Sequence, residues 1–330
     1  MIITQTPLRI SFFGGGSDYP EHFNTDSGAT LGTSIDKYTY VTVNRLAAFF
    51  DYRVRVSYSR TELCRDVDEI QHPSVRECLR FMGVEHGIEI GVVTDLPART
   101  GLGSSSSFTV GLLHALHAYK GELVTPQQLA QEAVHVEREM IREHVGLQDQ
   151  YTCALGGLIH LVFSETSAVD ARRIPVPPDR LRALGERLMV FYTGIQRHAS
   201  EVLGQQMERT RSGAIRSSLL QLTALVDQAL EVLAVSPAPL SRFGELLHDG
   251  WLIKRKLSSA ISNAAIDSAY ERARAAGAIG GKLLGAGGGG FLLLYAEPEH
   301  QPAIQQALAD LLEVRFRFED QGTRLIFYRP

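Results

Sequence analysis

The chain has 330 residues, of which 44% are hydrophobic and 21% are charged. This length is typical of two packed domains, and the composition is that of a globular protein rather than a disordered one. A formal net charge of −4 argues against the broad basic footprint of a nucleic-acid binder, so we expect no nucleic-acid partner.

The cysteines and the apolar runs indicate in which cellular compartment the protein is expected. Cys64, Cys78 and Cys153 are too few and too widely spaced for a disulfide framework or a zinc site. The longest apolar runs, such as 291–296, are strand-sized, whereas a membrane span needs about 18 to 20 residues. Residues 1–4 lack the basic and apolar regions of a signal peptide. We therefore expect a cytoplasmic protein with no membrane partner.

The first half of the chain changes from strand periodicity to helix periodicity. Apolar and polar residues alternate, as in half-buried strands, around Val41 and Val43, Val54 and Val56, and Ile88, Ile90 and Val92. Helical spacing of apolar residues then predicts a helix over 104–117. Thr125 and Pro126 form a helix-start signal, which predicts a second helix running to about Arg142.

The second half mixes strands and helices. We predict strands at 157–163 and 188–192, joined by a proline-bearing connection at 169–183, and a helical region over about 200–276. A strand at 291–295, a helix at 302–312 and strands at 314–318 and 325–328 follow. Because strands and helices do not alternate regularly, the fold class is α+β rather than a doubly wound parallel sheet.

Residues 97–107 (Pro-Ala-Arg-Thr-Gly-Leu-Gly-Ser-Ser-Ser-Ser) form a candidate phosphate-binding loop between a strand and a helix. Glycines allow the backbone to approach a ligand closely, and serines at a helix start can cap it or bind a metal. The free amide groups of a helix start form an anion site. The stretch is neither a Walker A loop, which needs Gly-Lys-Ser/Thr, nor a dinucleotide fingerprint, which needs a final glycine.

Two acidic residues and a second glycine-rich run are further candidates. Glu137 falls on the helix that starts at Thr125, and Asp149 falls in a loop beyond it. A phosphoryl-transfer site needs one carboxylate on Mg²⁺ and usually another near the attacking hydroxyl, although two such acids taken alone are more often surface residues. The run at 280–290 precedes an apolar strand, so we expect a close backbone approach there.

Together these motifs resemble the GHMP kinases, the family of galactokinase, homoserine kinase, mevalonate kinase and phosphomevalonate kinase. Three family motifs occur in order, at 7–19, 97–107 and 281–290. The resemblance implies a two-domain fold. Residues 1–175 would form an ATP-binding domain like the second domain of ribosomal protein S5. Residues 176–330 would form a ferredoxin-like α+β sandwich, with ATP along the phosphate loop in the cleft between the domains.

The resemblance also implies roles for single residues. Asp149 matches the family's catalytic aspartate and Arg9 the arginine beside it, while Ser105 and Glu137 match the ligands of Mg²⁺. The phosphates of ATP would be bound by Gly101, Leu102, Gly103, Ser104, Ser105 and Ser106. The substrate would be bound by Ser11, Gly15, Gly16, Asp18, Tyr19, Arg197, Gly287 and Gly288.

Within the family, the segments 7–11, 33–38, 192–197 and 251–257 are similar to those of the D-glycero-D-manno-heptose 7-phosphate kinases. Galactokinase has Glu-His where this chain has Gly15 and Gly16, which argues against galactose. The resemblance implies an ATP- and Mg²⁺-dependent phosphotransferase that forms heptose 1,7-bisphosphate for nucleotide-heptose and surface polysaccharide (capsule or lipopolysaccharide) synthesis. Alternatives are a fucose- or galactose-type kinase, a mevalonate-pathway enzyme, or a non-catalytic regulator that binds sugar and ATP. The sequence also leaves open whether the chain forms a homo-oligomer.

A phosphorylated sugar needs a cationic contact in the protein. The basic residues that could supply it are Arg197, Lys254, Arg255, Lys256 and Lys282. We favour Arg197, because the guanidinium fork matches phosphate geometry best. A surface ion pair is the alternative for each of them.

Overall fold

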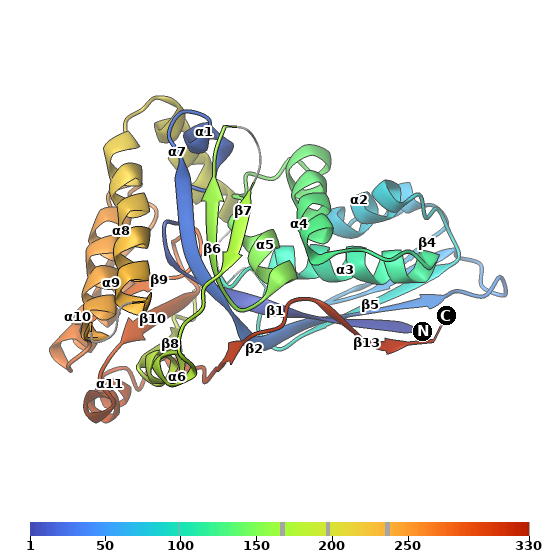
Figure 1. The fold of residues 1–330 in the computed structure, drawn as a ribbon. Helices are drawn as coiled ribbons and strands as arrows, with labels where there is room; N and C mark the ends of the chain where they lie inside the picture. Colours follow the sequence, from blue (N-terminus) through green and yellow to red (C-terminus); the bar gives the residue numbers. More distant parts are fainter. Residues whose placement is uncertain (99, 166–168, 196–198, 235–237, 330) are drawn as a thin grey trace.

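Two β-sheets organise the chain in this computed structural model, which describes residues 1–98, 100–165, 169–195, 199–234 and 238–329 (Figure 1). In the described residues the larger sheet has nine strands and the smaller has four. Helices cover both sheets, so the two-domain α+β fold is confirmed.

A long hairpin forms the centre of the larger sheet. Strands β1 (Ile2–Phe13) and β2 (Gly28–Arg45) pair antiparallel over most of their length. The first half of β2 also pairs with β6 (Leu158–Phe163), and its second half pairs with β5 (Ile88–Thr94). The outer strands are β3 (Val54–Ser57) beside β5, β4 (Thr61–Cys64) beside β3, and β7 (Asp170–Arg173) beside β6.

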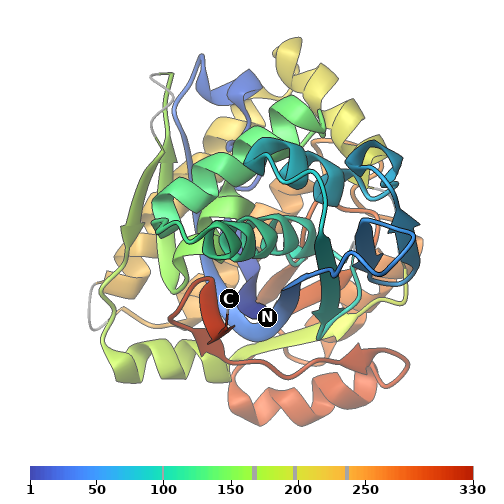
Figure 2. The ribbon, with the colours of Figure 1, turned by 90° about the vertical axis from the view of Figure 1, so that its right-hand side faces the viewer.

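Strands from the end of the chain return to this sheet. β13 (Arg324–Tyr328) pairs with β1, and β12 (Phe318–Glu319) pairs with β2. The amide of Arg329 donates to the carbonyl of Met1 at 2.9 Å, so the two ends of the chain lie side by side (Figures 1 and 2). The larger sheet thus draws on both halves of the sequence, and the division into 1–175 and 176–330 stays a prediction.

The smaller sheet is antiparallel and carries its own helices. Its strand order is β11 (Leu312–Glu313), β8 (Leu188–Tyr192), β10 (Phe291–Tyr295) and β9 (Gly280–Leu283). The helices α8 (Arg216–Ala234), α9 (Ser241–Lys254) and α10 (Ala264–Ala275) lie on the left of Figure 1, and α9 packs on β9. Their buried side chains share one core with this sheet and with Phe12 and Phe13 of β1.

The helices of the first half lie over the larger sheet (Figures 1 and 2). α3 (Ser104–Lys120) contacts both β1 and β2, and α2 (Pro73–Met82), α4 (Pro126–His135) and α5 (Gln148–Leu155) pack around α3. The remaining helices are α1 (Pro20–Phe23), α6 (Pro178–Glu186), α7 (Ala199–Arg211) and α11 (Gln301–Ala307), with 3-10 turns at Val67–Glu69 and Pro298–His300. Among the described residues, no helix has both the length and the apolar character needed to span a membrane.

Four predicted elements differ in extent from those in the structure. The helix predicted to run to about Arg142 consists of α4, which ends at His135, and a π-helical turn, Val136–Met140, that follows it directly. The connection predicted at 169–183 contains β7 and the start of α6. The strand predicted at 314–318 is a crossing between the two sheets, because Val314 bonds to Val190 of β8 and the carbonyl of Arg317 accepts from Asp36 of β2. The helix before this crossing ends at Ala307.

Candidate active site

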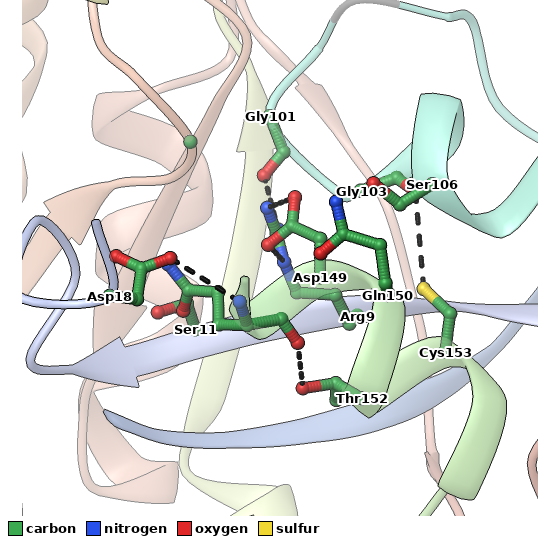
Figure 3. Close-up of polar contacts among 12 residues, drawn as sticks. Arg9, Ser11, Asp18, Gly101, Gly103, Ser106, Asp149, Gln150, Thr152 and Cys153 are labelled. Carbon is green, nitrogen blue, oxygen red and sulfur yellow. Dashed lines mark hydrogen bonds and ion pairs between the residues drawn. The ribbon is translucent and has the colours of Figure 1, made fainter. Parts of the chain in front are cut away.

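Arg9 and Asp149 form a two-pronged ion pair (Figure 3). Nε of Arg9 donates to Oδ1 of Asp149 at 2.7 Å, and Nη2 donates to Oδ2 at 2.5 Å. The third nitrogen, Nη1, donates to the carbonyl of Gly101 at 2.7 Å. Arg9 lies on β1 and is 4% exposed, whereas the side chain of Asp149 is 24% exposed. One buried guanidinium therefore holds a partly open carboxylate against the candidate phosphate loop.

Asp149 lies in the first turn of α5, not in the loop where the sequence placed it. A carboxylate there is favoured by the positive end of the helix dipole. The loop before it is fixed on Asp18, because a Cβ on Gly146 would lie 1.9 Å from Oδ2 of Asp18. The amides of Leu147 and Gln148 donate to the carbonyl and to Oδ2 of Asp18, at 3.0 and 3.3 Å.

Asp18 is itself held by backbone groups. Its Oδ1 accepts from the amide of Gly16 at 2.9 Å, and the residue is 1% exposed. Burial raises the pKa of Asp18, and the negative charge of Asp149 adds to this effect. The geometry makes Asp18 a support for the start of α5. Its predicted role as a sugar ligand stays a prediction.

Glu137 is a fully buried carboxylate on the π-helical turn. Such turns occur frequently at functional sites. Oε2 accepts from Oγ of Ser106 at 2.9 Å and from Nε2 of Gln150 at 2.5 Å. Oε1 has no hydrogen-bond partner within the described residues. Burial raises the pKa of Glu137 to about 7, and the hydrogen bonds that the carboxylate accepts only partly oppose this effect.

The residues around Glu137 fit a magnesium ion. A buried carboxylate oxygen without a partner, next to a serine hydroxyl, is the oxygen chemistry that Mg²⁺ prefers, with phosphate oxygens and water as further ligands. The described residues contain no group of three or more His, Cys, Asp and Glu that could hold a metal without such ligands. Ser106 is the serine that reaches Glu137, while Ser105 is exposed. The predicted role of Ser105 as a ligand stays a prediction, and Gln150 is a partner that sequence reasoning missed.

The candidate phosphate loop leads into an open helix start. Gly103 is the N-cap of α3 and has no side chain that could cap the first turn, which leaves this end suited to an anion. The amide of Arg9 donates to the carbonyl of Leu102 at 3.0 Å, which fixes the loop on β1. The second glycine run closes on it, since a Cβ on Gly285 would lie 2.4 Å from Cα of Gly101. The close approach predicted for this run is thus present.

The predicted substrate residues border the same region. Oγ of Ser11 is buried without a hydrogen-bond partner among the described residues, and the space at Gly15 faces both Ser11 Oγ and Nε2 of Gln148. Gly16 lies against Gln206 of α7. Tyr19 packs with Leu203, Met207 and Ala286, and the amide of Gly288 donates to the carbonyl of Ile261, against which Gly287 packs. Arg197 lies outside the described residues.

The other candidate cations have different surroundings. Lys282 donates to the carbonyls of Ser11 and Phe12 at 2.9 and 2.8 Å. Arg255 pairs with Asp267 at 3.0 Å, and Lys256 is exposed. Lys254 is buried and donates to the carbonyl of Gly285 at 2.5 Å.

Comparisons with known proteins agree with this geometry. The family model described as GHMP kinases N terminal domain matches residues 72–157, and the one described as GHMP kinases C terminal matches 238–314. The first match includes the phosphate loop, Glu137 and Asp149, and the second includes the second glycine run.

Individual relatives cover nearly the whole chain. A D-glycero-alpha-D-manno-heptose 7-phosphate kinase of Campylobacter jejuni is 27% identical over an alignment 324 residues long, which covers 93% of this chain and 93% of its own. A galactokinase of Pyrococcus furiosus is 24% identical and covers 93% of this chain and 92% of its own. The solved structure of a D-glycero-D-manno-heptose 1-phosphate kinase from Bacteroides thetaiotaomicron has a TM-score of 0.76, 21% identity and full coverage of both chains, which shows the shared fold.

Proposed function

Because the chain belongs to the GHMP kinase family, we propose that it transfers the γ-phosphoryl group of ATP to a sugar hydroxyl. We further propose that the acceptor is the anomeric hydroxyl of D-glycero-D-manno-heptose 7-phosphate. The observation that carries the proposal is the guanidinium of Arg9, which binds Asp149 with two nitrogens and the phosphate loop, through the carbonyl of Gly101, with the third. The carboxylate that would receive the acceptor thus adjoins the loop that would hold the donor.

The donor would bind at the start of α3. The amide groups of the first turn would hold the phosphates of ATP. The glycines at 101 and 103 allow the loop to pack closely on Leu284 and on Arg9. Glu137 and Ser106 would hold Mg²⁺ together with phosphate oxygens, and the ion would neutralise charge on those oxygens.

Asp149 would act on the acceptor. Its carboxylate would accept or orient the proton of the attacking hydroxyl, and the two hydrogen bonds from Arg9 hold the carboxylate in position for this role. Such general-base help is worth about 10²- to 10⁴-fold in rate. Positioning and charge neutralisation supply most of the remaining gain, because the transition state is loose.

Two observations support a heptose phosphate as the acceptor. The C. jejuni relative carries that activity in its name and matches 93% of the chain. Gly15, in the loop at 14–19 (the acceptor loop), also leaves the space beside Ser11 and Gln148 without a side chain, which would make room for a seven-carbon sugar. Gly16 packs instead on Gln206 and Leu219. The galactokinase relative is nearly as similar, so a hexose is the alternative acceptor that the assay must separate.

A substrate panel tests the proposal. ADP release from ATP and Mg²⁺ is measured with heptose 7-phosphate, heptose, fucose, galactose and mevalonate. We expect the highest kcat/KM with heptose 7-phosphate and a 1,7-bisphosphate product by phosphorus NMR. Faster turnover of fucose or galactose would show that this sugar, and not heptose 7-phosphate, is the acceptor. If none of the compounds led to ATP consumption, the kinase proposal would be rejected in favour of a non-catalytic regulator.

A further inference from the structure

Lys254 is a buried ammonium group with few partners. It is the last residue of α9 and is 8% exposed. Its Nζ donates to the carbonyl of Gly285 at 2.5 Å, and this is its one hydrogen bond within the described residues. An ammonium group has three donors, so two of them are available to a ligand.

The position of Lys254 connects the two loops of the site. Gly285, which it bonds, packs on Gly101 of the phosphate loop, at 2.4 Å from a Cβ on Gly285 to Cα of Gly101. Lys254 also lines a small recess together with Gly14 and Gly15 of the acceptor loop. Lys254 therefore adjoins residues of both the loop proposed for the donor phosphates and the loop proposed for the acceptor.

The charge of Lys254 has no carboxylate in contact. The guanidinium of Arg9 is already engaged by Asp149, whereas no described ion pair includes Lys254. Burial lowers the pKa of Lys254 to about 8, helped by the positive charge of Arg9, and the charges of Asp18 and Asp149 only partly oppose this. A buried cation without a partner is costly, and an anion bound beside it would remove that cost.

A purely structural role explains Lys254 less well. A neutral amide side chain could donate to the carbonyl of Gly285 without the cost of burying a charge. The other described candidates are also accounted for, since Lys282 bonds two carbonyls and Arg255 pairs with Asp267. Lys256, two residues further on, is exposed.

We propose that Lys254 binds a phosphate oxygen in the active site, as a second cation beside Arg9. The inference rests on the proposed kinase function, because the phosphate is either the γ-phosphate of ATP or the phosphate that the acceptor carries. Both sources present the same dianionic oxygens, and both loops adjoin the ammonium.

The test uses three variants of the full chain and two pairs of ligands, with affinity measured by calorimetry. Lys254→Gln keeps a donor for Gly285 but removes the charge, Lys254→Arg keeps the charge, and Lys256→Gln is the exposed control. The ligand pairs are AMP-PNP against ADP, and heptose 7-phosphate against heptose. In one of the two pairs, we expect Lys254→Gln to lower the affinity for the member with the additional phosphate, AMP-PNP or heptose 7-phosphate, by about 10- to 100-fold. The affinity for the other member of that pair should change little. The arginine and control variants should stay within about threefold.

The affected pair identifies the source of the phosphate. Loss confined to AMP-PNP assigns Lys254 to the γ-phosphate, and loss confined to heptose 7-phosphate assigns it to the acceptor. If the wild-type chain does not bind heptose 7-phosphate, the proposed acceptor is wrong, and the nucleotide pair alone decides the role of Lys254. Equal losses within both pairs, or no loss in either, would overturn the inference and leave Lys254 as a support for Gly285.

A pH series gives a second readout that a structural role would not change. Lys254 must be protonated to bind an anion, so affinity for the phosphate-bearing ligand should fall as the pH rises through about 8. Lys254→Arg should remove this fall, because arginine stays charged. The charged groups that act on Lys254 are Arg9 of β1, Asp18 of the following loop, Asp149 of α5 and Lys282 of β9. All four remain in the arginine variant, so a fall that persists there would count against Lys254.

Discussion

At the scale of single residues, the carboxylate of Asp149 is the most direct target. Asp149→Asn keeps the size of the side chain but removes its charge and one strong acceptor for Arg9. We expect kcat to fall by at least about 10²-fold, because the general base is lost, while ATP affinity changes little. Asp179→Asn, which changes an exposed acid on α6, is the matched control. Turnover equal to wild type in the Asp149 variant would remove this residue from the mechanism.

The raised pKa of Glu137 leads us to predict that both the stability of the chain and its metal binding depend on pH. Its pKa in the folded chain is raised to about 7 from an ordinary value of 4.5, so its contribution to stability is full below pH 4.5 and is lost as the pH rises through about 7. Glu137→Gln should therefore increase the unfolding free energy by up to about 3 kcal/mol at pH 8 and by less at pH 5. The same variant should lose the Mg²⁺-dependent part of nucleotide affinity.

Urea unfolding at both pH values, with nucleotide calorimetry with and without Mg²⁺, measures these effects. In the wild-type chain, Mg²⁺-dependent affinity should fall as the pH drops through about 7, because protonation removes the ligand charge. A variant whose stability gain is the same at pH 5 and pH 8 would show that the pKa of Glu137 is not raised in the folded chain.

The sequence predicted which residue types form the site better than it predicted their contacts. Arg9, Glu137 and Asp149 were predicted from the resemblance to the GHMP kinases, and their roles stay predictions. The sequence could not predict which serine reaches Glu137. Neighbouring helix positions point about 100° apart, and the direction of each depends on where the helix begins. The partner Gln150 was missed for the same reason, since its contact depends on how α5 and the π-helical turn meet.

At the scale of elements, the start of α5 depends on one glycine. A Cβ at Gly146 would lie 1.9 Å from a carboxylate oxygen of Asp18, so Gly146→Ala must displace the loop that positions Asp149. We expect a loss of about 1 to 3 kcal/mol in stability and a larger relative loss in kcat than in ATP affinity. Thermal melting and ADP release measure both effects.

Gly204→Ala on α7 is the control for that change. A Cβ at Gly204 meets nothing within 4 Å, and alanine is the better helix former, so the control should be neutral or stabilising. Gly146→Ala with full activity would show that Asp18 and α5 can separate without cost.

Elements whose boundaries depend on other elements were the ones that sequence periodicity missed. The turn Val136–Met140 adds a wider helical ring that apolar spacing does not encode, and it is the turn that carries Glu137. Residues 314–318 have strand-like composition, yet they bond first to β8 and then to β2 as the chain passes between the sheets. By contrast, α3 and the cap of α4 at Thr125 depend on local residues and were predicted correctly.

At the scale of the whole molecule, the two ends of the chain share one sheet. No local pattern could predict that β13 pairs with β1, because the partners lie more than 300 positions apart. Thr323 fixes this return: its hydroxyl bonds to that of Thr6 at 2.8 Å and to Nδ1 of His114 on α3 at 3.1 Å. The larger sheet and its helices are thereby closed by residues from the second half.

This closure predicts that both halves unfold together. Thr323→Val leaves Thr6 and His114 without their partner and should lower stability by about 1 to 3 kcal/mol. Trp251, the only tryptophan, is buried on α9 beside the smaller sheet and reports on the other half. We expect its fluorescence midpoint in urea to fall by the same amount as the midpoint from circular dichroism. Thr61→Val, on the exposed edge strand β4, should change the unfolding free energy from either probe by no more than about 0.5 kcal/mol. A circular-dichroism midpoint that falls while the Trp251 midpoint stays in place would mean that the two sheets unfold independently.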